Sequence, residues 1–504
     1  MSSLLKRHDF SGGIDLNEFA EKQIDGFVSL SFEKGDEIRI PLSAHVGRDS
    51  IPCVKVGQRV RQYEQIASAD GPVSVAQHAP CAAVVTALVG DGYQEAGANP
   101  SHIVLECDGS VQAASGAESL ELEKLSDSPA LLKEVETRIS ASGIVGMGGA
   151  GFPAHLKLHE GIDTEIEDFI INGVECEPLA RGDRYLLQAH IDEILDGAKI
   201  IKTLLRPQRT VLAVGPWLEV SELGRRLADA DIELLQTTAQ YPSGSEKQLI
   251  EILRGEELPL NRLPIHMGVV CFNVATVQAM YRAALFSQPC VSRMLTVNGS
   301  RKLVVEAPIG MTMELLLRKI GEPLSTQSYI TSGGMMMGRV LSPQSPVTKL
   351  THEVSIHESG DPPRGDSPCI RCGECSHVCP VRLQPQKLYE LARLGDLDGV
   401  QDYGLFDCIE CGCCSYVCPS NIPLLQHFIN GKFEVNELGV LSAERQQRRE
   451  RFVQHESRSL DETPSARYAT LADIPATDDD LLDSELEKLK ARIAKRDKSK
   501  GTSD

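Results

Sequence analysis

Eight cysteines between positions 369 and 418 have the spacing of iron–sulfur ligands. They form two runs, each written C-x2-C-x2-C-x3-C-P, and the runs close with Pro380 and Pro419. Thiolates at this spacing hold cubane [4Fe–4S] clusters, with three ligands on a tight loop and the fourth on the following helix. The alternative is a pair of tetrathiolate zinc sites, whose loops usually present two cysteines at a time. The repeated spacing favours iron–sulfur clusters, and therefore the transfer of single electrons.

The fourth cysteine of each run is expected to bind the cluster of the other run, as in two-cluster ferredoxins. The ligands of the first cluster are then Cys369, Cys372, Cys375 and Cys418. The ligands of the second cluster are Cys408, Cys411, Cys414 and Cys379. Cys413 is interpreted as a spectator because the ligand set is complete without it. Leucines at helical intervals in the spacer 383–406 predict the helical type of two-cluster ferredoxin.

A glycine-rich segment, residues 143–157, is the second place where chemistry is expected. It reads G-I-V-G-M-G-G-A-G-F-P-A-H-L-K and satisfies G-x-G-x-x-G, but an amphipathic helix precedes it where the dinucleotide motif requires a strand. Glycines still let backbone amides approach a phosphate or a flat ring, and a helix beginning near Pro153 would add its positive end. Lys157 would reach the same anion. The alternative is a turn that serves only packing.

Polar residues follow predicted strands in the next part of the chain. Residues 166–178, I-E-D-F-I-I-N-G-V-E-C-E-P, predict a buried strand ending at Asn172, Glu175 and Glu177. The segments 241–249 and 271–280 each place polar residues at the start of a helix. Alternating strands and helices predict a doubly wound α/β domain, in which ligands bind beyond the carboxyl ends of the strands. The alternative for the two glutamates is a solvated strand end.

The region 38–105 consists of short β-type runs divided by turns, which predicts a small barrel or sandwich. Its pattern resembles the barrel-sandwich fold of biotinyl and lipoyl carrier domains. Those carriers present a modifiable lysine at a hairpin tip, whereas the tip here reads Ala69-Asp70-Gly71-Pro72. The fold is therefore expected without the carrier function, as a docking or covering element.

The composition limits the classes of function. A chain of 504 residues has room for about three to five modules. A net charge of −20 argues against nucleic acid as a partner, because phosphate binding needs a positive surface. No apolar run approaches the length of a membrane span, and the N-terminus lacks the apolar core of a secretory signal. We expect an intracellular protein in a reducing compartment, with only peripheral membrane contact.

The order of these motifs resembles the flavin-bearing NADH subunit of respiratory complex I. With the barrel-sandwich and the twin cysteine runs added, residues 8–435 resemble the RnfC family, which belongs to the Rnf electron-transport complex. The stretch 342–368, which contains several prolines, is expected to be a linker. The resemblance implies a multidomain α/β and α+β chain, composed of a β barrel-sandwich (1–110), a complex-I-like Rossmann-type FMN/NADH domain (129–290), a soluble-ligand-binding β-grasp module (291–342), a helical two-cluster ferredoxin (360–435) and a charged helical or disordered tail (436–504).

The resemblance also implies the residues that bind the flavin and the nucleotide. The FMN ligands carried over are Gly146, Gly148, Gly149, Gly151, Lys157, Asn172, Tyr241, Gly244, Asn273 and Thr276, the last at the phosphate. The residues expected to face NADH are Phe152, Glu175, Glu177 and Glu246. Met147 departs from the complex I pattern, which has arginine there, and Ser245-Glu246 replaces two adjacent glutamates. One carboxylate fewer bears on the strength and redox selectivity of nucleotide binding.

The implied function is electron input. NADH would reduce FMN, and the electrons would pass singly to two [4Fe–4S] clusters and on to integral-membrane and iron–sulfur subunits of an Rnf complex. By resemblance, that complex would couple the flow to ferredoxin, as terminal redox partner, and to ion translocation. This chain would lie peripherally at the cytoplasmic face of the inner (cell) membrane. One alternative is a soluble flavin and iron–sulfur reductase for corrinoid cofactors. The other is a non-catalytic electron-relay subunit whose nucleotide site has lapsed.

Overall fold

The computed structural model describes residues 5–17, 24–90, 101–110, 119–259, 262–322, 324–325, 328–358 and 367–439. The predicted tail lies outside this range beyond residue 439. The chain divides into two compact units, Met1–Pro363 and Arg364–Asp504, and each is described by itself. Among the described residues, no helix is both long and apolar enough to cross a membrane.

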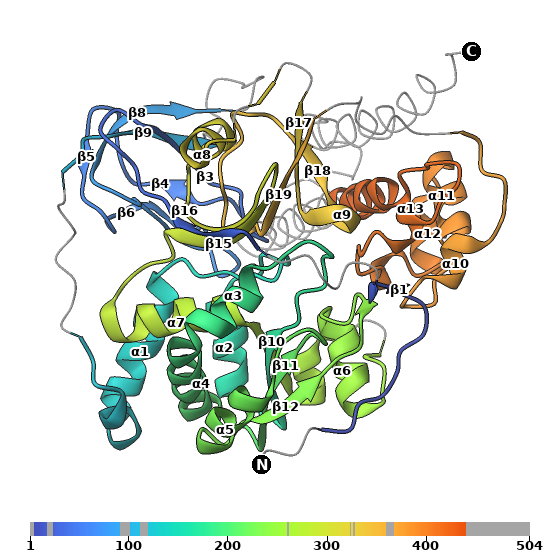
Figure 1. The fold of residues 1–504 in the computed structure, drawn as a ribbon, viewed down its shortest axis with the longest axis horizontal. Helices are drawn as coiled ribbons and strands as arrows, with labels where there is room; N and C mark the ends of the chain where they lie inside the picture. Colours follow the sequence, from blue (N-terminus) through green and yellow to red (C-terminus); the bar gives the residue numbers. More distant parts are fainter. Residues whose placement is uncertain are drawn as a thin grey trace, which may run out of the picture. The chain divides into compact units, whose positions relative to one another are not determined.

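A four-stranded parallel sheet forms the centre of the α/β part of the first unit (Figure 1). Its order is β12 (Glu233–Gln236), β11 (Arg209–Val214), β10 (Asp168–Gly173) and β14 (Val269–Asn273). The helices around it are α1 (Pro129–Ala141), α2 (Ala154–Ile162), α3 (Gly182–Ala189), α4 (Ile191–Leu205), α5 (Ser221–Asp229), α6 (Glu246–Arg254) and α7 (Val274–Phe286).

Alternate residues of β10 pack on opposite faces of this sheet, because successive side chains of a strand point to opposite sides. Phe169 and Ile171 pack in the core that includes α4 and α7. Ile170 packs in a second core with Leu249 and Ile252 of α6. Helices therefore cover both faces, and the predicted doubly wound arrangement is confirmed. The uninterrupted run of apolar residues in β10 is explained by this burial on both faces.

Helix α1 begins where the sequence predicted and leads directly into the glycine-rich segment. Pro129 occupies its first turn, and the Ser128 hydroxyl accepts a hydrogen bond from the Leu131 amide at 3.4 Å. Helix α2 then begins at Ala154, immediately after Pro153, as expected. The glycine-rich segment therefore connects two helices rather than a strand and a helix.

The barrel-sandwich prediction is confirmed by two small antiparallel sheets. One sheet has the order β3 (Glu37–Pro41), β9 (His102–Cys107), β8 (Ala83–Val89) and β5 (Arg59–Val60), and the other has β4 (Ile51–Pro52), β6 (Gln65–Ser68) and β7 (Gln77–His78). Buried residues such as Ile38 and Ile66 belong to the same continuous core as Phe169 of the parallel sheet. The barrel-sandwich is thus packed against the α/β part.

A third, six-stranded sheet takes strands from outside the predicted range 291–342. Its order is β18 (Arg339–Leu341), β17 (Tyr329–Ser332), β19 (Glu353–His357), β15 (Ser292–Asn298), β16 (Lys302–Pro308) and β2 (Gly26–Ser29), with α8 (Met313–Ile320) and α9 (Gly334–Met337) beside it. Strand β19 pairs with β15, and Val354 is fully buried. The prediction of a linker over the whole of 342–368 is therefore wrong, since backbone pairing with a distant strand leaves no local signature.

The N-terminal segment contributes strands to two other sheets. Strand β2 lies parallel to β16 at the edge of the six-stranded sheet. Strand β1 (Ile14–Asp15) pairs with β13 (Gln240–Tyr241), which leads into the loop before α6. Residues before the barrel-sandwich therefore pair with strands of the α/β part and of the six-stranded sheet.

The second unit is helical, as the spacer predicted. Helices α11 (Pro385–Leu394) and α12 (Leu397–Asp402) lie between the cysteine runs, and a further helix covers 424–439. The two runs have the same backbone path: Arg371 and Glu410 both have φ of 58°, and Gly373 and Gly412 have φ of 86° and 79°. Short helices follow, α10 (Glu374–His377) and α13 (Cys413–Tyr416).

Candidate functional site

The glycine loop, residues 146–151, is a small closed turn with one open side. The Gly146 amide donates to the Phe152 carbonyl at 2.8 Å, and the Gly151 amide donates back to the Gly146 carbonyl at 3.1 Å. Gly149 has φ of +108°, and a Cβ atom added there would meet no atom within 4 Å. The backbone of the loop is therefore approachable at Gly149. Its positive φ is a conformation that only glycine adopts without strain.

Two buried side chains hold this loop from behind. The Met147 amide donates to the Thr276 hydroxyl at 3.0 Å, and that hydroxyl lies 3.4 Å from the Val145 carbonyl. Arg293 donates from Nη2 to the Met147 carbonyl at 2.6 Å. Thr276 was expected at a phosphate, but its hydroxyl is engaged by the loop backbone and its side chain is fully buried. Thr276 therefore holds the loop, and its assignment to the phosphate stays a prediction.

The end of β10 is fixed to the loop before α6. Asn172 donates from Nδ2 to the Gly244 carbonyl at 2.8 Å, and the Gly244 amide donates to the Cys176 sulfur at 2.9 Å. Tyr241, on the neighbouring strand β13, is 2% exposed. Three of the predicted FMN residues are thus brought together at the carboxyl end of the sheet, where α/β folds bind ligands.

The close contact at Gly244 gives a stability prediction. A Cβ atom there would lie 2.3 Å from the Val174 carbonyl oxygen, so Gly244→Ala forces the two backbones apart. We expect a loss of about 1–3 kcal/mol of unfolding free energy, seen as a lower melting temperature by Trp217 fluorescence. Gly215→Ala is the matched control, because a Cβ atom there meets nothing within 4 Å. Equal melting temperatures for the two variants would contradict this account.

Lys157 and Glu246 form one ion pair rather than two separate contacts. Lys157 Nζ lies 2.8 Å from Glu246 Oε1 and 3.2 Å from the Cys271 carbonyl. Burial acts to lower the pKa of Lys157, but Glu246, Cys271 and Glu160 together raise it, so the net pKa is raised and the lysine stays charged. The sequence assigned Lys157 to FMN and Glu246 to NADH, and the structure places them side by side.

Glu175 and Asn273 meet at the first turn of α3. Glu175 accepts the backbone amides of Asp183 and Arg184 at 2.9 and 3.1 Å, and Asn273 donates from Nδ2 to Asp183 at 2.5 Å. Burial and the nearby Asp183 raise the pKa of Glu175 to about 7. Sequence reasoning missed Asp183, although an acid in the first turn of a helix after a strand end was the available signal.

Glu177 contacts the backbone of the short helix α9. Its carboxylate accepts the amides of Met336 and Met337, both at 3.1 Å, and the residue is 6% exposed. Any Cβ atom on Gly334 would overlap this carboxylate. Burial raises the pKa of Glu177 to about 8, although the amides oppose the shift. Its assignment to the nucleotide stays a prediction, because here the carboxylate is occupied by the backbone.

The raised pKa of Glu177 predicts a pH dependence of stability. The folded chain holds a proton on Glu177 that the unfolded chain releases, so the contribution of this residue is lost as pH rises from 4.5 to about 8. Glu177→Gln keeps a neutral side chain. We therefore expect the melting temperature of Glu177→Gln, relative to that of the wild type, to increase between pH 6 and pH 9. Thermal unfolding followed by Trp217 fluorescence measures it. Glu256→Gln, at an exposed position, should track the wild type. Parallel curves for Glu177→Gln would refute the assignment.

A hollow of about 340 Å³ lies at the carboxyl ends of β10 and β11. Its lining includes Glu175, Arg181, Arg184, Gly215 and Trp217. Trp217 is the single tryptophan of the chain, and it offers a flat face beside two guanidinium groups. Sequence reasoning did not select Trp217, because a lone aromatic residue after a strand has no motif.

In the second unit, the first predicted ligand set lines one hollow of about 370 Å³. Its walls contain Cys369, Cys372, Cys375 and Cys418, together with apolar residues. This is the cross-run grouping that the spacing predicted, because Cys418 comes from the other run. Cys369 and Cys372 are exposed. Among the described residues, no group of three ligating side chains is close enough to hold a single metal ion.

The second predicted ligand set is also gathered in one place. Burial raises the pKa of the Cys414 thiol, and the neighbouring Cys411, Cys408 and Cys379 raise it further, as does Cys375 of the first set. Backbone amides reach two of these sulfurs: Leu383 donates to Cys379 at 3.2 Å and Glu410 donates to Cys408 at 3.4 Å. Amide hydrogen bonds to cluster sulfurs influence reduction potential.

Curated relatives resemble the chain over most of its length. The RnfC protein of the ion-translocating oxidoreductase complex of Rhodobacter capsulatus is 34% identical over 410 residues, which is 79% of this chain and 78% of that protein. The chain belongs to the RnfC family. The Pseudomonas aeruginosa member is 35% identical over 467 residues, 90% of this chain but 59% of its own length. The chain thus spans 59% and 54% of the first two relatives it matches, the second from Pasteurella multocida.

Three family descriptions match parts of this RnfC-family chain. Residues 8–110 match the RnfC barrel sandwich hybrid domain, residues 139–282 the Nuo51 FMN-binding domain, and residues 366–422 the 4Fe-4S dicluster domain. A solved NAD+-reducing [NiFe]-hydrogenase in the H2-reduced state aligns with 64% of this chain and 65% of its own, at TM-score 0.42 and 16% identity. From the family matches, the chain carries an FMN domain and a [4Fe–4S] dicluster domain.

The residues present fit these cofactors. At Gly149 an added Cβ atom would have no neighbour within 4 Å, so the loop leaves room for a flat ring or a phosphate, and the start of α7 adjoins it at Asn273. The hollow in the second unit offers four thiols, and Arg371 is the one charged side chain among its lining residues. Four thiols are the donor set of a [4Fe–4S] cluster.

Proposed function

We propose that this chain is the NADH-oxidising, electron-input subunit of an ion-translocating oxidoreductase complex. The observation that supports this most is the presence, in one chain, of a glycine loop open at Gly149 and two cross-run sets of four cysteines. Bound FMN supplies the step between hydride, which carries two electrons, and clusters, which take one each.

The residues of the chain have three tasks in this proposal. The glycine loop, with Asn172 and Gly244, holds FMN, and Thr276 and Arg293 hold the loop. The hollow beside Trp217 receives part of the nucleotide, where the indole stacks on a base and Arg181 and Arg184 meet phosphate. The cysteines hold the clusters, while burial and amide hydrogen bonds set their potentials.

The partners proposed are integral-membrane and iron–sulfur subunits of the same complex, with ferredoxin as the terminal redox partner through them. We propose that the chain associates peripherally at the cytoplasmic face of the membrane. The curated relatives are named as subunits of such a complex, which supports this placement. We further propose that the six-stranded sheet is the β-grasp module, since the hairpin β15–β16 is followed by α8 and by β19 parallel to β15.

The match of residues 8–110 to the RnfC barrel-sandwich supports this function over a soluble corrinoid reductase. One experiment distinguishes the proposed NADH-oxidising subunit from a non-catalytic electron relay. The chain is purified without oxygen, its flavin and cluster absorption is recorded, and NADH is added. Bleaching of both sets of bands is expected. If NADH changes nothing while dithionite reduces the clusters, the relay replaces the proposal.

A further inference from the structure

A second hollow, of about 470 Å³, lies between α7, the loop 286–292 and the strands β15 and β16. We call it the junction pocket. None of the residues predicted to bind FMN lines it, although Met147 of the glycine loop does. Its lining combines apolar side chains with a few converging polar groups, which is typical of sites that bind small molecules. It adjoins the glycine loop through Met147.

Arg293 lines this pocket and lacks one hydrogen-bond acceptor. The residue is 3% exposed, and its Nε and Nη2 donate to the Thr351 and Met147 carbonyls at 3.1 and 2.6 Å. Its Nη1 is buried and meets no acceptor among the described residues. Leaving a buried guanidinium donor unpaired is costly, so an acceptor bound beside Nη1 would be favoured.

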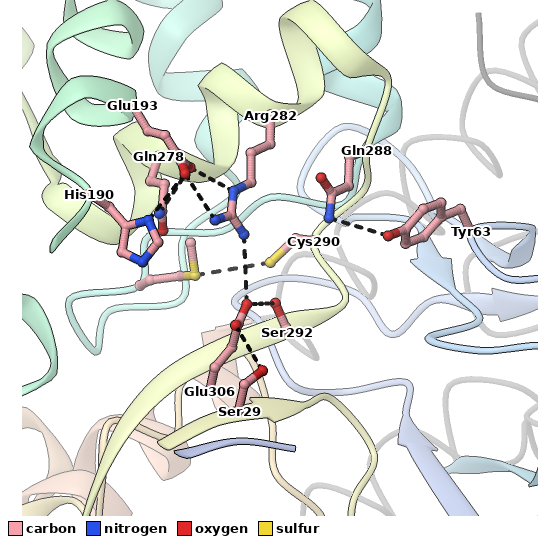
Figure 2. Close-up of polar contacts among 11 residues, drawn as sticks. Ser29, Tyr63, His190, Glu193, Gln278, Arg282, Gln288, Cys290, Ser292 and Glu306 are labelled. Carbon is pink, nitrogen blue, oxygen red and sulfur yellow. Dashed lines mark hydrogen bonds and ion pairs between the residues drawn. The ribbon is translucent and has the colours of Figure 1, made fainter. Parts of the chain in front are cut away.

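Arg282 adds a second guanidinium group at the other side of the pocket. Figure 2 shows it between Glu193 and Glu306. Its Nε and Nη2 lie 2.7 and 3.3 Å from the Glu193 carboxylate, so Nη1, which is 3.7 Å from Glu306, is its one loosely paired donor group. Glu306 already accepts hydrogen bonds from Ser292 at 3.2 Å and from Ser29 at 3.3 Å. The pocket therefore has donors to offer, while its acid is occupied.

Three of the eight apolar residues that line the pocket carry sulfur. Met147, Cys290 and Met294 all line the pocket, and the Cys290 sulfur lies 4.0 Å from that of Met147. Thioether and thiol sulfur make favourable contacts with aromatic rings. A flat ring suits this wall, and a carboxylate suits the two guanidinium groups, which bind it with paired hydrogen bonds.

We propose that the junction pocket binds a small aromatic carboxylate. The ring packs against the sulfur-rich wall, and the carboxylate accepts from Arg293 and Arg282. Because Arg293 also holds the Met147 carbonyl, occupancy of the pocket is linked to the glycine loop. This site is additional to the NADH, FMN and cluster sites and does not depend on them.

Calorimetric titration of the full chain with its cofactors tests the proposal, using benzoate as the probe. Benzamide has the same shape without the charge, and cyclohexanecarboxylate has the charge without the flat ring. Ala279→Leu fills the pocket from α7, and Ala130→Leu makes the same change at an exposed position of α1. Arg282→Met keeps the apolar stem but removes the donors, and it serves if Ala279→Leu does not fold.

Benzoate is expected to bind saturably to the wild type and to Ala130→Leu with the same affinity. Its affinity should fall by about tenfold or more in Ala279→Leu and Arg282→Met, and benzamide should bind the wild type about tenfold more weakly than benzoate. Absence of saturable benzoate binding, or full affinity in both pocket variants, overturns the proposal. Equal binding of benzamide overturns the carboxylate, and equal binding of cyclohexanecarboxylate overturns the aromatic ring.

Discussion

Gly148→Leu is expected to abolish FMN retention while both clusters remain. A Cβ atom at Gly148 would lie 3.5 Å from Asn273 Cβ, which is ordinary contact, and the rest of a leucine side chain would fill the mouth of the loop beside Asn273. The predicted flavin ligands on both sides would then be blocked. The clusters belong to the other compact unit, so their ligands are untouched. FMN released by acid and iron per chain are the measurements.

Gly148→Ala is the matched control for this experiment. The single added carbon meets only an ordinary van der Waals contact, and Gly148 is not among the glycines with positive φ, so backbone strain does not enter. We expect this variant to retain FMN near the wild-type level. Full FMN in Gly148→Leu would show that the flavin lies elsewhere. Joint loss of FMN and iron would show that the two units do not hold their cofactors independently.

The second large effect is expected at the neighbouring cysteines 413 and 414. Cys414→Ser should remove one cluster, so that iron falls from about eight to about four atoms per chain, because a [4Fe–4S] cluster needs its four thiolates. Cys413→Ser should keep all the iron. Both residues are buried in the same short helix α13, so the pair differs in ligand role rather than in exposure.

Low-temperature EPR of the reduced variants shows which cluster is lost. Cys379→Ser should give the same missing signal as Cys414→Ser, although Cys379 belongs to the first run, because the cross-run assignment gives both thiols to one cluster. Cys418→Ser should remove the other signal, since Cys418 lines the hollow of the first set. If Cys379→Ser removes the signal that Cys369→Ser removes, each run binds its own cluster and the cross-run assignment is wrong.

Local patterns carried much of the prediction of the fold. The strand at Asp168–Gly173, the helix after Pro153 and the helix capped by Asn273 were all foreseen. They depend on apolar periodicity, on proline and on capping residues within a few positions. The six-stranded sheet was foreseen only in part. Its strand β19 pairs with β15 more than fifty residues earlier, and β2 comes from the N-terminal segment, which no local pattern records.

The site shows the same division between local and distant information. By itself the sequence predicted the cysteine ligands, because three ligands of each cluster come from a few consecutive residues, and it selected the glycine loop. The tertiary structure decided the partners of these groups. Arg293 donates to the carbonyl of Met147, which is 146 residues earlier in the chain. Glu177 accepts an amide of α9, from Met336, which is 159 residues later. Such contacts arise from packing of whole elements, where burial and the need to pair every polar group fix the neighbours, and spacing along the chain does not encode them.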